Sequence, residues 1–264
     1  MKSNHVLAKL KRGEPSIGTW LSLPDPLAAR LMATVGFDWL TVDLEHSPIN
    51  IETAATSFAM IAAGGPAPLA RISWNTGENI KRVLDNGAWG VVVPMVNDRQ
   101  SAELAVESAR YAPAGRRSVG GQYHAASFDT DSPKYYERAN DEILLVVMIE
   151  HIEGVENADK ILSVPGINAV FIGPNDLTKS MGKKPSFESS DKDFVDALNH
   201  VKTIAKKNGV APGIHVADAA AAQRRIVEGF QFIAITSELG MMLAKAKEVA
   251  TTLGLGNNRD VAKY

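Results

Sequence analysis

Two acidic residues in the second half of the chain have the placement expected of metal ligands. Glu150 directly follows the apolar run Leu144–Ile149, and Asp176 follows the run Ala169–Ile172 after a Gly-Pro-Asn turn. A charge placed directly after a buried run is costly unless it is paired or binds a ligand. A lone acidic residue usually caps a helix or pairs with a lysine, but two carboxylates at consecutive strand ends favour a metal site. Carboxylates and water molecules suit a hard cation such as Mg²⁺ or Mn²⁺.

A histidine just beyond another apolar run is a candidate acid or base. The run Trp39–Asp43 continues into Leu44, Glu45 and His46. An isolated histidine is usually an ordinary polar residue, but Asp43 is close enough in sequence to orient the imidazole of His46 or a metal-bound water. A histidine oriented in this way can take up and return a proton near neutral pH.

Arg71, at the end of the next apolar run, could bind an anion. Its planar guanidinium can donate several hydrogen bonds to a carboxylate or to a developing enolate oxygen. The alternative is a salt bridge at the rim of the fold to Glu45 or Asp43, which the sequence alone ranks nearly as high.

These residues must be positioned by strands, and short runs rich in apolar and β-branched residues recur along the chain, each followed by helical periodicity. Asp191 and Asp218 stand at predicted helix N-caps, and Gly209 and Gly229 follow predicted helix ends. The predicted strands are Ser16–Leu21, Trp39–Asp43, Pro68–Ile72, Gly90–Pro94, Leu144–Ile149, Ala169–Ile172, Ala211–Ile214 and Phe232–Thr236. The predicted helices are Pro26–Thr34, Ile51–Ala63, Glu78–Asp85, Arg99–Ala109, Ala158–Leu162, Asp191–Lys207, Asp218–Val227 and Leu239–Leu253.

Eight β-α units in 264 residues predict an α/β fold, a single (β/α)₈ TIM barrel spanning residues 1–264. The carboxyl ends of its strands meet at one mouth, which would bring the charged residues together. His215 and the pair Ser237-Glu238 also lie at strand ends. A doubly wound open sheet is the alternative, but no G-x-G-x-x-G follows the first run. We expect residues 111–141 to form a loop insertion over the barrel mouth and residues 254–264 to form a polar tail.

Composition excludes several classes of function. The 28 basic and 30 acidic residues leave a net charge of -2 without a basic block, so nucleic acid is not an expected partner. The absence of cysteine excludes thiol chemistry and fits a cytoplasmic location, and no apolar run is long enough for a membrane span or a signal peptide. No lysine lies in a predicted strand, which excludes a Schiff-base aldolase. Glu238 disfavours a phosphorylated ligand at the last strand.

Several motifs together resemble one known family. The chain is similar to the 4-hydroxy-2-oxoheptane-1,7-dioate aldolases, the metal-dependent class II pyruvate aldolases of the aldolase/citrate-lyase superfamily, from about residue 13 to residue 253. The motifs that carry this resemblance are Gly18-Thr19-Trp20, Asp43-Leu44-Glu45-His46, Ala70-Arg71, Pro113-Ala114-Gly115-Arg116-Arg117, Glu150-x-x-Gly-Val and Phe171-Ile-Gly-Pro-Asn-Asp-Leu177.

The resemblance implies a barrel with an exchanged C-terminal helix, assembled as a hexamer of three dimers, that binds Mg²⁺, Mn²⁺ or Co²⁺. It implies that Glu150 and Asp176 bind the metal, that His46 is the acid/base, and that Asp43 and Glu45 partner His46 and the metal waters. Arg71 would stabilise the enolate of pyruvate, and the backbone from Pro174 through Asn175 to Asp176 would hold the pyruvate carboxylate. Trp20 and Met148 would line the substrate site. Met148 stands where the family often has glutamine, so one hydrogen bond near the substrate is lost.

The function implied is reversible cleavage of a 4-hydroxy-2-oxo acid to pyruvate and an aldehyde through a pyruvate enolate stabilised by the metal. The same site could decarboxylate oxaloacetate, as macrophomate synthase, a fungal relative, does. A barrel that only binds oxo acids is a further alternative, although the complete set of His46, Arg71, Glu150 and Asp176 argues against it.

Overall fold

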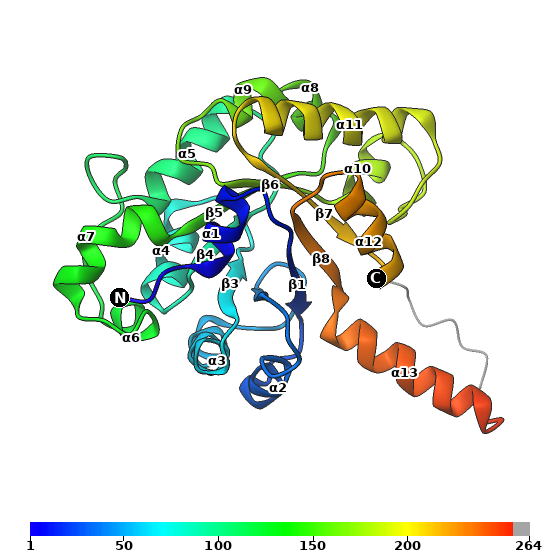
Figure 1. Ribbon diagram of the computed structural model, residues 1–264, viewed down its shortest axis with the longest axis horizontal. Helices are drawn as coiled ribbons and strands as arrows, with labels where there is room; N and C mark the ends of the chain where they lie inside the picture. Colours follow the sequence, from blue (N-terminus) through cyan, green and yellow to red (C-terminus); the bar gives the residue numbers. More distant parts are fainter. Residues whose placement is uncertain (256–264) are drawn as a thin grey trace.

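The computed structural model describes residues 1–255 and shows a closed barrel of parallel strands in the order β1 to β8 (Figure 1). The predicted TIM barrel is therefore confirmed, and the open doubly wound sheet is excluded. Most of the expected polar tail, from residue 256 on, lies outside the described residues. The strands are β1 (Ser16–Leu21), β2 (Trp39–Asp43), β3 (Ala67–Arg71), β4 (Gly90–Val93), β5 (Leu144–Ile149), β6 (Ala169–Ile172), β7 (Ala211–Val216) and β8 (Phe232–Ser237).

Large aromatic side chains fill the barrel interior. The indole of Trp39 stacks on the ring of Phe232 with centroids 4.3 Å apart, and Phe171 packs edge-on against Phe232. Gly18 makes room for this packing, because a Cβ at that position would lie 2.1 Å from the Trp39 ring. The strands are buried almost throughout, which explains why they read as continuous apolar runs.

Helices surround the strands, and aspartate side chains cap several of them. Asp191 accepts hydrogen bonds from the backbone N–H groups at the start of α11, and Asp218 does the same for α12, as predicted. The helices are α1 (His5–Lys11), α2 (Pro26–Met32), α3 (Ile51–Gly64), α4 (Gly77–Asp85), α5 (Arg99–Ala109), α6 (Tyr123–Ser127), α7 (Ser132–Glu142), α8 (Ile152–Glu156), α9 (Ala158–Leu162), α10 (Pro174–Ser180), α11 (Lys192–Lys207), α12 (Ala219–Val227) and α13 (Glu238–Thr252).

The insertion over residues 111–141 does not cover the barrel mouth, so that expectation was wrong. The segment holds α6 and most of α7 and packs where strands begin. Trp89, just before β4, donates its Nε1–H to the Ser127 hydroxyl oxygen at 2.9 Å and stacks on Phe128. The buried Asn4 side chain donates to the carbonyl oxygens of Trp89 and Glu142. The reason lies in the topology: the segment joins the end of α5 to the start of β5, and both lie at the end of the barrel opposite the mouth.

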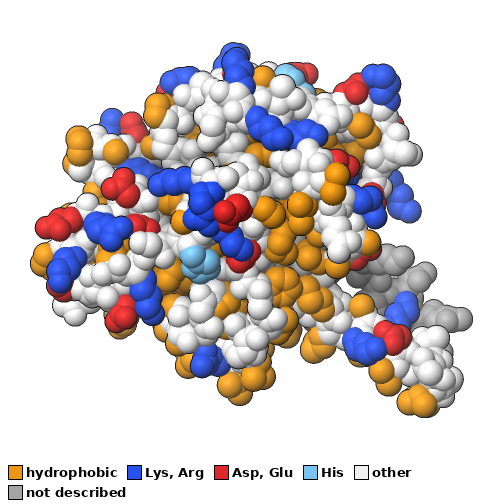
Figure 2. All heavy atoms as spheres, viewed as in Figure 1, with side chains coloured by type: hydrophobic (Ala, Val, Ile, Leu, Met, Phe, Trp, Pro, Cys, Tyr) orange, Lys and Arg blue, Asp and Glu red, His pale blue; other side chains and the backbone are white. Residues whose placement is uncertain are grey.

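The last helix, α13, extends away from the barrel (Figure 1). Three apolar side chains in α13 and one just after it are 45% to 66% exposed: Met242, Leu243, Val249 and Leu253. Figure 2 shows hydrophobic side chains on the surface where this helix leaves the barrel. Among residues 1–255, no helix combines the length and the hydrophobicity that crossing a membrane requires.

Candidate active site

The mouth of the barrel holds a tight ion pair between two strand ends. Arg71 donates from Nε and Nη2 to the two carboxylate oxygens of Asp43, at 2.9 and 2.6 Å. Burial alone would raise the pKa of Asp43, but the hydrogen bonds and the charge of Arg71, together with two backbone N–H groups, outweigh burial and lower that pKa. Asp43 is therefore an anion paired with the guanidinium of Arg71.

The carboxylate of Asp43 also contacts the backbone of the loop after β2. It accepts hydrogen bonds from the backbone N–H groups of Glu45 and His46, at 3.0 and 3.3 Å, and within residues 1–255 it forms no hydrogen bond with the imidazole. The expected role of Asp43 as a partner of His46 and of metal waters stays a prediction. The rim salt bridge that the sequence offered as an alternative for Arg71 is the one the structure contains, and it includes Glu45, whose Oε2 lies 3.3 Å from Nε of Arg71.

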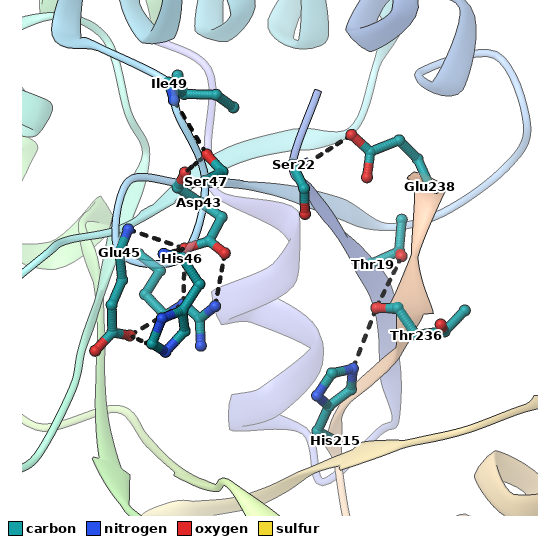
Figure 3. Close-up of polar contacts among 11 residues, drawn as sticks. Thr19, Ser22, Asp43, Glu45, His46, Ser47, Ile49, His215, Thr236 and Glu238 are labelled. Carbon is teal, nitrogen blue, oxygen red and sulfur yellow. Dashed lines mark hydrogen bonds and ion pairs between the residues drawn. The ribbon is translucent and has the colours of Figure 1, made fainter. Parts of the chain in front are cut away.

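The imidazole of His46 lies beside Glu45 instead. Its Nε2 is 3.7 Å from Oε2 of Glu45, and the histidine side chain is 57% exposed at the mouth (Figure 3). Burial raises the pKa of Glu45, against the charges of Arg71 and His46. Within residues 1–255 its buried Oε2 makes these two ion-pair contacts but accepts no hydrogen bond. A buried carboxylate oxygen that accepts no hydrogen bond is suited to a ligand that donates a hydrogen bond or carries positive charge.

Glu150 is a second deeply buried carboxylate at the mouth, being 4% exposed. Its Oε1 accepts a hydrogen bond from the backbone N–H of Met95 at 2.8 Å, and Met95 has the left-handed φ of 52° that aims this N–H. Burial raises the pKa of Glu150 to about 7, with further contributions from the charges of Glu45 and Asp176. The contact with Met95 could not be predicted from residue types, because nearly every residue has a backbone N–H.

The carboxylates of Glu150 and Asp176 fit a hard divalent cation. Asp176 lies in the exposed first turn of α10, and the helix start has no side-chain cap. Gly173 allows the approach of Glu150, because a Cβ there would lie 2.7 Å from Oε2 of Glu150. Within residues 1–255 no group of three or more potential protein ligands gathers around one point, so water or substrate oxygens would have to complete the coordination.

The remaining predicted residues surround these charges. Trp20 is buried, and the guanidinium of Arg71 lies over its ring at 4.4 Å. Met148 is 2% exposed, and its Cε would be 3.5 Å from a Cβ at Gly173, so it packs on the Glu150 side of the mouth. Pro174 is buried and Asn175 is half-buried at the start of α10.

Glu238, which the sequence suggested as a negative charge at the mouth, is bound by backbone. It accepts hydrogen bonds from the N–H groups of Ser22, Leu23 and Leu239 (Figure 3 shows the contact with Ser22). Its carboxylate therefore holds the loop after β1 by hydrogen bonds.

Comparison with known proteins gives the family. The HpcH/HpaI aldolase/citrate lyase family matches residues 16–244. The chain belongs to this family. A 4-hydroxy-2-oxo-heptane-1,7-dioate aldolase from Shigella flexneri is 36% identical over 260 residues, which cover 98% of this chain and 97% of that relative.

Solved structures agree with this assignment. A crystal structure of an HpcH/HpaI aldolase/citrate lyase family protein from Burkholderia cenocepacia J2315 has a TM-score of 0.88 at 30% identity and covers 96% of this chain and 100% of the other. A citrate synthase structure has a TM-score of 0.84 at 28% identity and covers 94% and 96% of the two chains. The resemblance seen in the sequence is confirmed, and this HpcH/HpaI family member is a carbon–carbon lyase.

Proposed function

We propose that this lyase cleaves 4-hydroxy-2-oxo acids to pyruvate and an aldehyde, and that it catalyses the reverse addition. The proposal rests on the placement of Arg71 and the buried carboxylate of Glu150 at the same barrel mouth. The two groups are close enough for the charge of each to shift the pKa of the other. A site of this kind can bind an oxo acid and stabilise the negative charge that forms on it.

The proposal includes a divalent metal ion, Mg²⁺, Mn²⁺ or Co²⁺, held by Glu150 and Asp176. When bound, such an ion supplies positive charge that polarises the carbonyl group of the 2-oxo acid. The family membership and the two oxygen donors support this part of the proposal. A cytoplasmic location remains a prediction from the cysteine-free sequence.

The chain's own residues divide the remaining work. Arg71 donates hydrogen bonds to the substrate oxygen that becomes negative, and the carboxylate of Asp43 keeps the guanidinium in position. His46, exposed at the mouth beside Glu45, takes the proton from the 4-hydroxyl group in cleavage and returns it in addition. After Pro174, which has no N–H, the uncapped backbone N–H groups of Asn175 and Asp176 donate to the substrate carboxylate.

Incubation with pyruvate and either glycolaldehyde or succinic semialdehyde tests the proposal. We expect an addition product with Mn²⁺ and none after chelation of the metal. If no aldehyde gave a metal-dependent product, the aldolase function would be wrong.

Oxaloacetate decarboxylation is the second candidate, favoured by Met148. This buried apolar side chain cannot supply the amide hydrogen bonds of a glutamine, whereas loss of CO₂ requires no aldehyde acceptor. The ratio of kcat/KM for oxaloacetate to that for a hydroxy-oxo acid decides which reaction dominates.

We further propose that the protein is a homo-oligomer, a hexamer of three dimers in which α13 is exchanged between subunits. The exposed apolar residues of α13, and the exposed Leu27, Leu31 and Val35 in and after α2, support a partner surface.

A further inference from the structure

His215, near the end of β7, is a polar side chain at the mouth that the proposed mechanism does not use. Its Nε2 lies 3.1 Å from the carbonyl oxygen of Thr236 on the neighbouring strand β8 (Figure 3). A carbonyl oxygen can only accept a hydrogen bond, so the hydrogen of the neutral ring is on Nε2 and the lone pair is on Nδ1.

An irregularity in the barrel creates this contact. The pairing of β1 with β8 shifts register between Gly18 and Trp20, and Thr236 at this point has a φ of 38°. The backbone at Thr236 departs from the regular strand conformation, and its carbonyl oxygen accepts from the imidazole. Backbone irregularities of this kind commonly mark functional positions at barrel rims.

The other ring nitrogen is left available. Within residues 1–255, Nδ1 of His215 has no hydrogen-bond partner, and the residue is only partly buried. Burial lowers the pKa of His215 to about 4, so the imidazole is neutral at physiological pH and Nδ1 acts as an acceptor.

Three aromatic rings lie around the imidazole of His215. The ring centroids of Phe187, Trp20 and Phe171 lie 4.8, 5.8 and 6.3 Å from that of His215. Trp20 also lies under the guanidinium of Arg71, so one indole links these rings to the charged group that receives the oxo acid. Apolar surroundings with one hydrogen-bond acceptor favour a ligand with one hydroxyl group.

We propose that His215 is a specificity residue, which accepts a hydrogen bond at Nδ1 from a hydroxyl group on the aldehyde partner and so selects hydroxyaldehydes over aliphatic aldehydes. The inference rests on the proposed aldolase function and names its class of acceptor. A site built to pair with a hydroxyl group discriminates against an analogue that lacks it, because the ligand then covers the acceptor Nδ1 without giving it a hydrogen bond.

The test compares glycolaldehyde with propionaldehyde, in which a methyl group replaces the hydroxyl group. Three variants separate the two ring nitrogens: His215→Leu removes both, His215→Gln can retain the donor to Thr236, and His215→Asn places an oxygen close to the position of Nδ1. We expect the wild type to prefer glycolaldehyde. In the Leu and Gln variants the ratio of kcat/KM for glycolaldehyde to kcat/KM for propionaldehyde should fall about tenfold. The Asn variant should retain most of the preference.

The control measurement is the rate at which the methyl hydrogens of pyruvate exchange for deuterium, recorded by NMR in the presence of Mn²⁺. This measurement reports enolate formation and needs no aldehyde. We expect equal exchange rates in the wild type and all three variants. If exchange is normal but the Leu variant slows both aldehydes equally, or the wild type shows no preference, the role of His215 is wrong while the proposed function stands. If the wild type itself shows no exchange, the proposed function fails, and the inference with it.

Discussion

Asp43 and Arg71 are register partners at the ends of β2 and β3, and their side chains form a two-pronged ion pair across that last rung of the sheet. The strands therefore fix the direction of the guanidinium, and only a planar fork can fill both contacts.

Replacement of Arg71 by lysine keeps the charge but loses the fork. We expect kcat/KM to fall by on the order of 10² with the barrel intact, because a donor to the developing charge is lost. Steady-state kinetics and circular dichroism check this. Arg82→Lys, in an exposed pair with Glu78 on α4, is the control that should leave kcat/KM and the circular dichroism spectrum unchanged. Full activity in Arg71→Lys would contradict the role of the fork.

Replacement of His46 by alanine should lower kcat by on the order of 10² to 10⁴, the usual contribution of a positioned acid or base. Metal affinity, measured by calorimetry with Mn²⁺, should stay the same, because His46 is not one of the proposed ligands. His200→Ala, on the exposed side of α11, is the matched control. A loss of metal binding in His46→Ala would make this histidine a ligand instead.

Glu150→Ala and Asp176→Ala should each give a folded protein that binds Mn²⁺ weakly and has no measurable lyase activity. Both changes remove charge at the mouth and leave the apolar barrel interior untouched. Glu153→Ala, an exposed acidic residue in α8 close to Glu150 in sequence, should behave like the wild type. Wild-type metal affinity in Glu150→Ala would overturn the proposed metal site.

The raised pKa of Glu150 predicts that the metal-free protein loses stability as the pH rises. The unfolded chain ionises near the ordinary value of 4.5, whereas the folded protein holds the proton up to about 7. The free energy of unfolding should therefore decrease between these values, by on the order of 3 kcal/mol in total.

Thermal melts in metal-free buffer from pH 5 to pH 8 measure this effect. Glu150→Gln, which carries no charge, should flatten the dependence, and Mn²⁺ should raise the Tm of the wild type more at pH 8 than at pH 5. An identical pH profile in Glu150→Gln would show that another group causes the decrease.

The exposed face of α13 predicts an assembly that polar substitution can break. Met242→Glu combined with Leu243→Glu places charge in the proposed interface, and light scattering after gel filtration should show a smaller species than the wild type. Lys247→Glu, a charge change on the same helix, should leave the mass unchanged. A wild type that is already monomeric would reject the exchanged helix.

The sequence predicted the strands and the charged residues at their ends because both follow from local pattern: apolar runs buried on two faces, then a charge. It could not decide whether Asp43 would contact His46 or Arg71, since that choice depends on side-chain direction across two strands. The helix α6 was missed because it has only five residues, and α7 because its sequence is mostly polar. Their position followed from chain connectivity and not from composition. The backbone contact of Met95 with Glu150 has no counterpart in residue type.

The space beside Glu150 also sets a limit on how this enzyme can diversify. Any side chain at position 173 would meet the buried carboxylate, whereas a Cβ at Gly120 would meet no atom within 4 Å. A gene library randomised at both codons and selected for lyase activity should therefore retain glycine alone at the first and accept many residues at the second. Evolution of new acceptor specificity must proceed around position 173 and not through it.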